Sequence, residues 1–128
     1  MSTIGTMESM TLVQKAAAAD KFLEWLKKKY PLPGVIILSE YLPRKTIRKD
    51  IPAQLLTDGS CYKISISADR LVSRVVQSMS HEYKHIMQLE LEHIPLSKLR
   101  DAEEIAAWTF SSSAMREYVA EVGDGWRP

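Results

Sequence analysis

The sequence contains little of what several classes of protein depend on. Its 128 residues include one cysteine, Cys61, so no disulfide can form within the chain, and a single thiol fits a reducing compartment. Its 17 basic and 16 acidic residues leave a net charge of +1, which argues against a dedicated nucleic-acid or membrane-surface binder. No stretch approaches the roughly 18 apolar residues of a membrane span, and residues 1–15 lack the basic and apolar segments of a signal peptide. We therefore expect a cytoplasmic protein that contacts neither nucleic acid nor a membrane.

What the sequence does contain is an ordinary globular composition. It is 45% hydrophobic and 26% charged, and its length is that of one domain over residues 1–128. Residues 1–9 are small and polar and are expected to be disordered. A domain of this size buries a core without a disulfide or a metal to hold it together, so any metal it binds is expected to serve function rather than folding.

Hydrophobic periodicity predicts three helices and two strands. The elements, in order, are a helix over residues 11–30, strands over 35–42 and 61–68, a helix over about 69–92 and a helix from about 96 or 98 to 122. Gly123 and Gly125 are expected to end the last helix, and the basic segment at 44–49 to form a solvated loop. This order is typical of a small α+β domain with an N-terminal helix and a short antiparallel sheet.

The most informative segment is the helix over 69–92, which contains His81, Glu82 and His85 in the spacing H-E-x-x-H. Residues four apart lie one turn apart on one helix face, so both imidazoles can be directed at one zinc ion. Glu82 is displaced around the helix from His81, so its carboxylate can reach a water on the metal without binding the metal itself. The three residues therefore predict a hydrolytic site in which Glu82 is the general base for a metal-activated water.

A catalytic zinc site uses three protein ligands, so one more must come from elsewhere in the chain. His93 lies eight residues after His85, which places it about two turns further along and on another side of the helix. Carboxylates on the following helix are better placed, because Glu103 and Glu104 stand 18 and 19 residues after His85. One of the two is expected to serve only the first turn of that helix, where negative charge is favourable.

With these motifs the chain resembles the gluzincins, which are zinc metallopeptidases with H-E-x-x-H on one helix and a glutamate on the next. Among them it is similar to the compact ImmA/IrrE-type metallopeptidases. In such families the ligand glutamate is often followed at three residues by alanine, and then by an aromatic and a small residue. The residues after Glu104 that fit this pattern are Ala107, Phe110 and Ser111. The resemblance therefore implies Glu104, rather than Glu103, as the third ligand.

The resemblance covers about residues 60–115 and implies a minimal zincin-like domain. It implies one zinc ion per chain, held by His81, His85 and Glu104. The implied activity is that of a metallopeptidase, which hydrolyses peptide bonds in a protein or peptide substrate. The substrate would pair with the strand over 61–68, which the resemblance places at the edge of the sheet.

Other interpretations stay open on the sequence alone. H-E-x-x-H can occur by chance on an exposed helix surface, and the chain would then be a metal-free binding module whose basic segment at 44–49 engages an acidic partner. A zinc-binding pseudoenzyme or protein-interaction domain without hydrolytic activity is a further alternative. Glu82 favours the enzyme, because zinc binding alone requires no carboxylate there. Trp108 departs from the family pattern, which usually has Asp or Asn four residues after the ligand glutamate.

Overall fold

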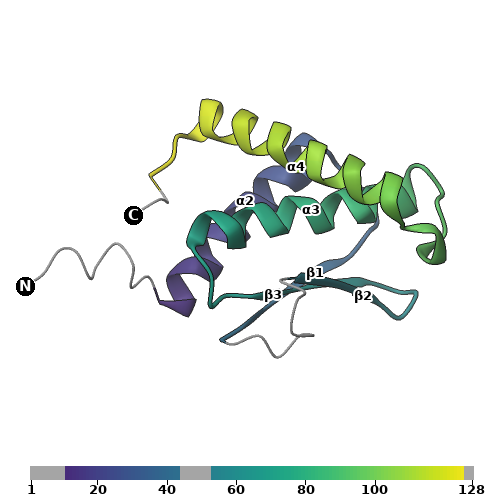
Figure 1. Cartoon of the computed structure of the whole chain (residues 1–128), viewed down its shortest axis with the longest axis horizontal. Coiled ribbons are helices and arrows are strands. Elements are labelled where there is room, and N and C mark those ends of the chain that lie inside the picture. The colour runs from purple at the N-terminus through teal and green to yellow at the C-terminus, as the bar shows by residue number, and fades with distance from the viewer. Residues whose placement is uncertain (1–10, 44–52, 126–128) are drawn as a thin grey trace, which may run out of the picture.

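The computed structural model describes residues 11–43 and 53–125 of the chain (Figure 1). The disorder expected at residues 1–9 and the solvated loop expected at 44–49 lie outside the described residues. Helices and strands follow one another as α2 (Leu12–Lys29), β1 (Ile37–Leu42), β2 (Ala53–Thr57), β3 (Tyr62–Ser67), α3 (Val72–Glu90), the short 3-10 helix η1 (Leu96–Lys98) and α4 (Asp101–Val122). The prediction of a small α+β domain is confirmed, with one strand more than expected.

The sheet differs from the prediction in its order and its pairing. The order β1-β3-β2 places β3 in the centre and the unexpected strand β2 at an edge. The expectation that 61–68 is an edge strand is therefore wrong. β3 pairs antiparallel with β2 but parallel with β1, so the expected antiparallel sheet is wrong for one of the two pairs. Parallel pairing needs a long connection between the strands, and here the connection is long enough because it contains β2.

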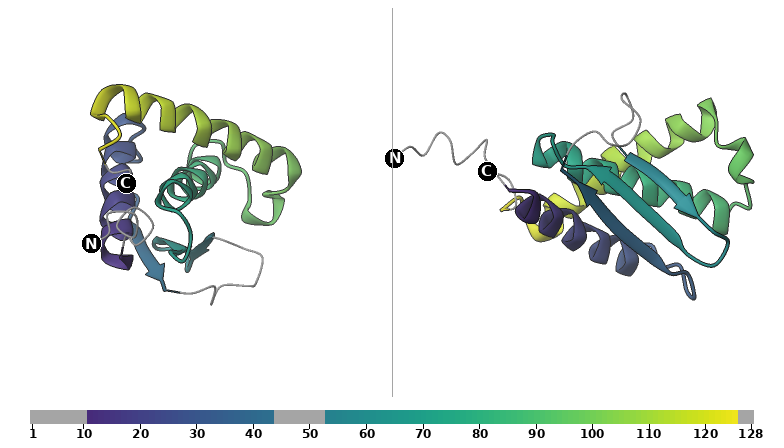
Figure 2. Two further views of the ribbon diagram at one scale, coloured as in Figure 1. Left: turned by 60° about the vertical axis from the view of Figure 1, so that its left-hand side comes forward. Right: turned by 90° about the horizontal axis from the view of Figure 1, so that it is seen from below.

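The described helices all lie on the same side of the sheet, as Figure 2 shows. α3 is the central helix, because it packs against the sheet, against α2 and against α4. None of the described helices is long and apolar enough to span a membrane. Because the sheet, α2 and α4 all pack against α3, this helix is covered around much of its circumference, and polar side chains on it can be buried.

The helix ends follow local chemistry. The Thr11 hydroxyl accepts a hydrogen bond of 3.1 Å from Gln14 N, and the Gln14 side chain accepts one of 2.9 Å from Thr11 N. This reciprocal pair satisfies donors that have no partner within the first turn of α2. α4 ends at Gly123, as predicted, and the φ of 90° at this residue is one that glycine adopts without strain.

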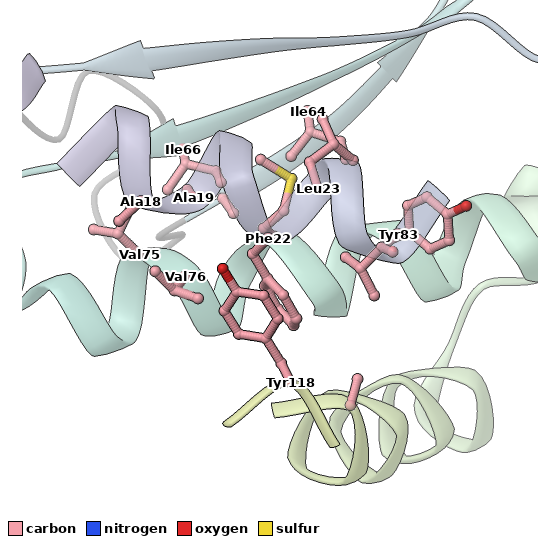
Figure 3. Close-up of a cluster of buried hydrophobic side chains, with 14 of the residues drawn as sticks. Ala18, Ala19, Phe22, Leu23, Ile64, Ile66, Val75, Val76, Tyr83 and Tyr118 are labelled. Carbon is pink, nitrogen blue, oxygen red and sulfur yellow. The ribbon is translucent and has the colours of Figure 1, made fainter. Parts of the chain in front are cut away.

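The hydrophobic core lies between α3 and its neighbours. β3 turns Ile64 and Ile66 to its buried face, and neither side chain has exposed surface. From α2 and α4, Phe22 and Tyr118 meet with ring centroids 4.7 Å apart (Figure 3). Burial stabilises the fold by about 1.5–3 kcal/mol for each large apolar side chain. α3 contributes five hydrophobic residues that have no exposed surface, namely Val75, Val76, Met79, Tyr83 and Ile86.

Candidate metal centre

His81, Glu82 and His85 of α3 are all buried in the folded protein. Only 6%, 7% and 4% of these residues, respectively, is exposed. The alternative of an exposed helix surface is therefore wrong. Burying polar side chains costs free energy unless a partner replaces the water that they lose. Three such residues within five positions need compensation from a neighbouring element or from an ion.

α4 approaches this part of α3 closely, because the residues at the contact are small. Ala107, Ser111 and Ala114 have no exposed surface. Ser111 Oγ lies 2.8 Å from Ser80 Oγ on α3, and it donates a hydrogen bond of 3.1 Å to the carbonyl oxygen of Gln77. Small side chains let two helix backbones approach each other. The contact holds the first turn of α4 beside the histidines.

Glu104, in the first turn of α4, reaches both histidines at once. Its Oε1 lies 2.8 Å from His81 Nε2, and its Oε2 lies 3.2 Å from His85 Nε2. One possible ligand atom from each of the three residues lies within 4.8 Å of the other two. Each carboxylate oxygen thus faces one imidazole nitrogen across the α3–α4 contact.

Hydrogen bonds do not satisfy this cluster. His85 Nε2 and His81 Nδ1 are buried and have no hydrogen-bond partner among the described residues. Glu104 Oε2 is close to His85 Nε2 but outside hydrogen-bonding geometry. A buried polar atom without a partner needs an explanation, and a bound ion is one. Imidazole nitrogen and carboxylate oxygen are metal ligands, so His81, His85 and Glu104 can hold a metal ion.

The surroundings shift the acid–base properties of the cluster. Burial and the neighbouring His85 lower the pKa of His81, while Glu104 raises it. The net lowering favours the neutral imidazole, which is the form that binds a metal. Burial raises the pKa of Glu82 to about 7; His85 opposes this shift and Glu104 adds to it. The Glu82 carboxyl can therefore take up and release a proton near neutral pH.

The two adjacent glutamates of α4 have separate surroundings. Glu103 Oε1 accepts a hydrogen bond of 3.1 Å from Arg100 N and so serves the start of the helix. Glu104 alone faces the two histidines. His93 is exposed, lies after the end of α3 and has a φ of 56°, which places it outside the cluster. Glu103 thus lies at the start of the helix and Glu104 lies beside the histidines, and the role of Glu104 as a metal ligand stays a prediction.

Trp108 lies against His81. The two ring centroids are 4.0 Å apart, with an angle of 45° between the ring planes, and 43% of Trp108 is exposed. The indole has a single polar group, an N–H that can only donate, so it offers no acceptor to an imidazole N–H. The departure from the family pattern therefore leaves His81 packed against an aromatic ring, with its Nδ1 unpaired.

One residue of the site was missed in the sequence. Gln88 is 1% exposed, and its Oε1 lies 2.8 Å from His85 Nδ1. The spacing of Gln88 from His85 could have indicated this contact, because a residue three positions after His85 lies one turn away on the same helix face.

Comparison with models of known protein families, with curated proteins and with solved structures finds no match for the chain. The features of the chain that bear on its function are therefore those of the site itself. The site consists of two histidines and Glu104 directed at one point, with the buried Glu82 directly after His81 in the chain.

Proposed function

We propose that the chain is a zinc-dependent metallopeptidase, as its resemblance to the gluzincins implies. The observation that carries the proposal is the convergence of His81, His85 and Glu104, from two helices, on one point. Two imidazoles and a carboxylate favour zinc over the other metals common in hydrolases. Bound there, one zinc ion per chain would supply a Lewis acid that polarises a peptide carbonyl and lowers the pKa of a coordinated water to about 7.

Glu82 is the general base in this proposal. It does not belong to the group whose ligand atoms converge, so its carboxylate is left for proton transfer. Its burial beside the cluster holds it at the site, where it accepts a proton from water and then passes the proton to the leaving amine. His85 lowers and Glu104 raises the pKa of the Glu82 carboxyl, which agrees with a position beside them.

The substrate strand has a different place from the one first expected. Since β3 is paired on both sides, an extended peptide cannot add to it. β2 has β3 on one side, and no strand pairs with its other edge among the described residues. β2 also packs against α3, the helix with the two histidines. We therefore assign the outer edge of β2 to the protein or peptide substrate, whose backbone can hydrogen-bond to a free strand edge.

A peptidase assay on the zinc-loaded protein tests the proposal. A mixture of unstructured peptides is incubated with the wild type, Glu82→Gln or Glu103→Gln, and the products are identified by mass spectrometry. Glutamine keeps the shape of Glu82 but cannot accept the proton, so we expect cleavage to fall by about 10²–10⁴ while the zinc content stays the same. Glu103→Gln is the matched control and should cleave like the wild type. Equal cleavage by the wild type and Glu82→Gln would contradict the role of Glu82.

A zinc-binding pseudoenzyme or interaction domain is the second candidate. Trp108 favours it, because this residue leaves His81 Nδ1 without the acceptor that commonly orients a ligand histidine. The same assay separates the two candidates. One zinc ion per chain without cleavage of any peptide would select the second candidate.

A further inference from the structure

We infer that Gln88 is a positioning residue that fixes the proton of His85 on Nδ1 and so turns the lone pair of Nε2 toward Glu104. The inference rests on the proposed metal site. Two hydrogen bonds of the buried Gln88 amide would set the tautomer and orientation of His85 before a metal binds.

The first step is the orientation of the amide. Gln88 Nε2 lies 3.0 Å from the backbone carbonyl oxygen of Glu103. A carbonyl oxygen can only accept, so the NH2 end of the amide must face it. The opposite orientation would place two oxygen atoms against each other in a buried position. A backbone carbonyl of α4 therefore determines which way the side chain of Gln88 points.

The second step is the tautomer of His85. With its NH2 end on Glu103, the amide presents Oε1 to His85 Nδ1 at 2.8 Å. An amide oxygen only accepts, so Nδ1 must carry the hydrogen and donate it. A neutral imidazole has one N–H, which leaves Nε2 with a lone pair.

The lone pair of His85 Nε2 faces the Glu104 carboxylate. His85 Nε2 is buried, has no hydrogen-bond partner among the described residues and lies 3.2 Å from Glu104 Oε2. At this distance the lone pair of His85 Nε2 and the lone pairs of Glu104 Oε2 repel each other, unless a cation lies between the two atoms. The same Gln88 amide that fixes the tautomer also joins α3 to the residue before Glu104. It therefore sets the position of both ligands relative to each other.

His81 shows what is missing when no such residue is present. Its Nδ1 has no partner among the described residues, and the Trp108 ring lies against it. Its Nε2 lies 2.8 Å from Glu104 Oε1, so the hydrogen of neutral His81 belongs on Nε2 in the metal-free protein. Of the two histidines, His85 is thus the one prepared for a metal, and Gln88 is the difference between them.

Nitrogen NMR of the histidine rings tests the inference, together with zinc affinity. Protein labelled with 15N at histidine is compared as wild type, Gln88→Leu and Gln77→Leu, with and without zinc, well above the ordinary histidine pKa of about 6.5. Leucine keeps the volume of Gln88 but not its acceptor. Gln77→Leu makes the same change on α3 and is the matched control.

We expect the wild type to carry the His85 hydrogen on Nδ1 with or without zinc, and Gln88→Leu to lose this preference in the absence of zinc. Zinc affinity, measured by competition with a chromophoric chelator, should fall about 10–100-fold in Gln88→Leu and stay unchanged in Gln77→Leu. A role in stability alone would change unfolding but not the tautomer. Wild-type affinity in Gln88→Leu, or a hydrogen on Nε2 of wild-type His85, would overturn the inference.

The outcome also separates this inference from the proposed function. A wild type that takes up no zinc would contradict the metallopeptidase, and the metal-free spectrum would still decide on Gln88. A hydrogen on Nδ1 in that spectrum supports the positioning role, and a hydrogen on Nε2 excludes it.

Discussion

The two halves of α4 pack against the rest of the protein by opposite chemistry. Its first half brings Glu104 to the histidines of α3, where two buried nitrogen atoms have no partner among the described residues. Its second half packs Tyr118 between Phe22 and Trp25 of α2, with ring centroids 4.7 Å and 5.3 Å away. The first contact buries polar groups at a cost in free energy, whereas the second buries apolar surface and stabilises the fold.

The difference shows how one helix can carry a cluster of buried polar groups that could hold a metal ion and still be packed firmly against its neighbours. The aromatic cluster, defined here as Phe22, Trp25, Tyr30, Phe110 and Tyr118, joins α2 to α4 through a series of ring contacts. Through Tyr118 it fixes α4 at the end far from Glu104, and Phe110 adds a ring contact with Tyr30 within the first half of the helix. The site can then remain incompletely hydrogen-bonded, as metal binding requires. Variants in the two halves should therefore have separable effects on zinc and on stability.

The largest effect is expected from the double variant His81→Ala/His85→Ala. It removes two of the three possible ligands, so bound zinc should be lost entirely, as measured by elemental mass spectrometry. The protein should stay folded by circular dichroism, because the aromatic cluster is unchanged. His93→Ala removes an exposed histidine outside the site and should keep its zinc. Zinc retained by the double variant would refute the site.

The next largest effect is expected at the other end, from Phe22→Ala. The ring is fully buried against Tyr118 and Trp25, so its removal should lower the free energy of unfolding by about 3–5 kcal/mol. Denaturant titration measures this loss, and Phe22→Leu should lose less. The folded fraction should bind zinc as the wild type does. A fall in zinc affinity in proportion to stability would mean that the two halves of α4 are coupled.

A smaller effect is expected from Tyr30→Phe at alkaline pH. Burial, together with the hydrogen bond to Glu117, raises the pKa of Tyr30 from 10.0 to about 12. The fold thus favours the neutral hydroxyl, so this contribution is complete below pH 10 and is lost between pH 10 and about 12. Over that range the stability of Tyr30→Phe should fall less steeply than that of the wild type. Parallel curves would exclude Tyr30 as a source of alkaline sensitivity.

The smallest effect is expected between the two halves, from Ser111→Ala. The hydroxyl contacts Ser80 Oγ and Gln77 O in the α3–α4 contact. Its loss should lower the free energy of unfolding by about 0.5–1.5 kcal/mol. Alanine still lets the helices approach, so zinc affinity should change little. A drop in zinc affinity as large as that of Gln88→Leu would show that this hydroxyl, rather than side-chain size, positions Glu104.

The sequence predicted the elements whose signals are local. Helical periodicity and the glycine at 123 located α2, α3 and the end of α4. β2 was missed because its five residues, Ala53–Thr57, are too few for a clear alternation. The parallel pairing of β1 with β3 was missed because it depends on where β2 lies, and no local pattern records that.

The site was predictable in part for the same reason. The spacing of His81 and His85 is local and identifies one helix face. Glu103 and Glu104 are neighbours, and only the packing of α4 determines which one faces the histidines. Gln88 could be seen by spacing, but its partner is a backbone carbonyl from another helix, which no residue type reveals. That Glu104 binds the metal stays a prediction until metal content is measured.

The backbone acceptor of Gln88 has a consequence for how the chain tolerates variation. Every residue has a carbonyl, so replacing Glu103 by another helix-forming residue leaves the acceptor in place. Positions 88, 103 and 104 should therefore differ in the number of substitutions that they tolerate. In a library covering every single substitution, position 103 should accept many residues, while positions 88 and 104 should accept few. We expect this tolerance at 103 because the main chain, and not a side chain, orients the amide of Gln88.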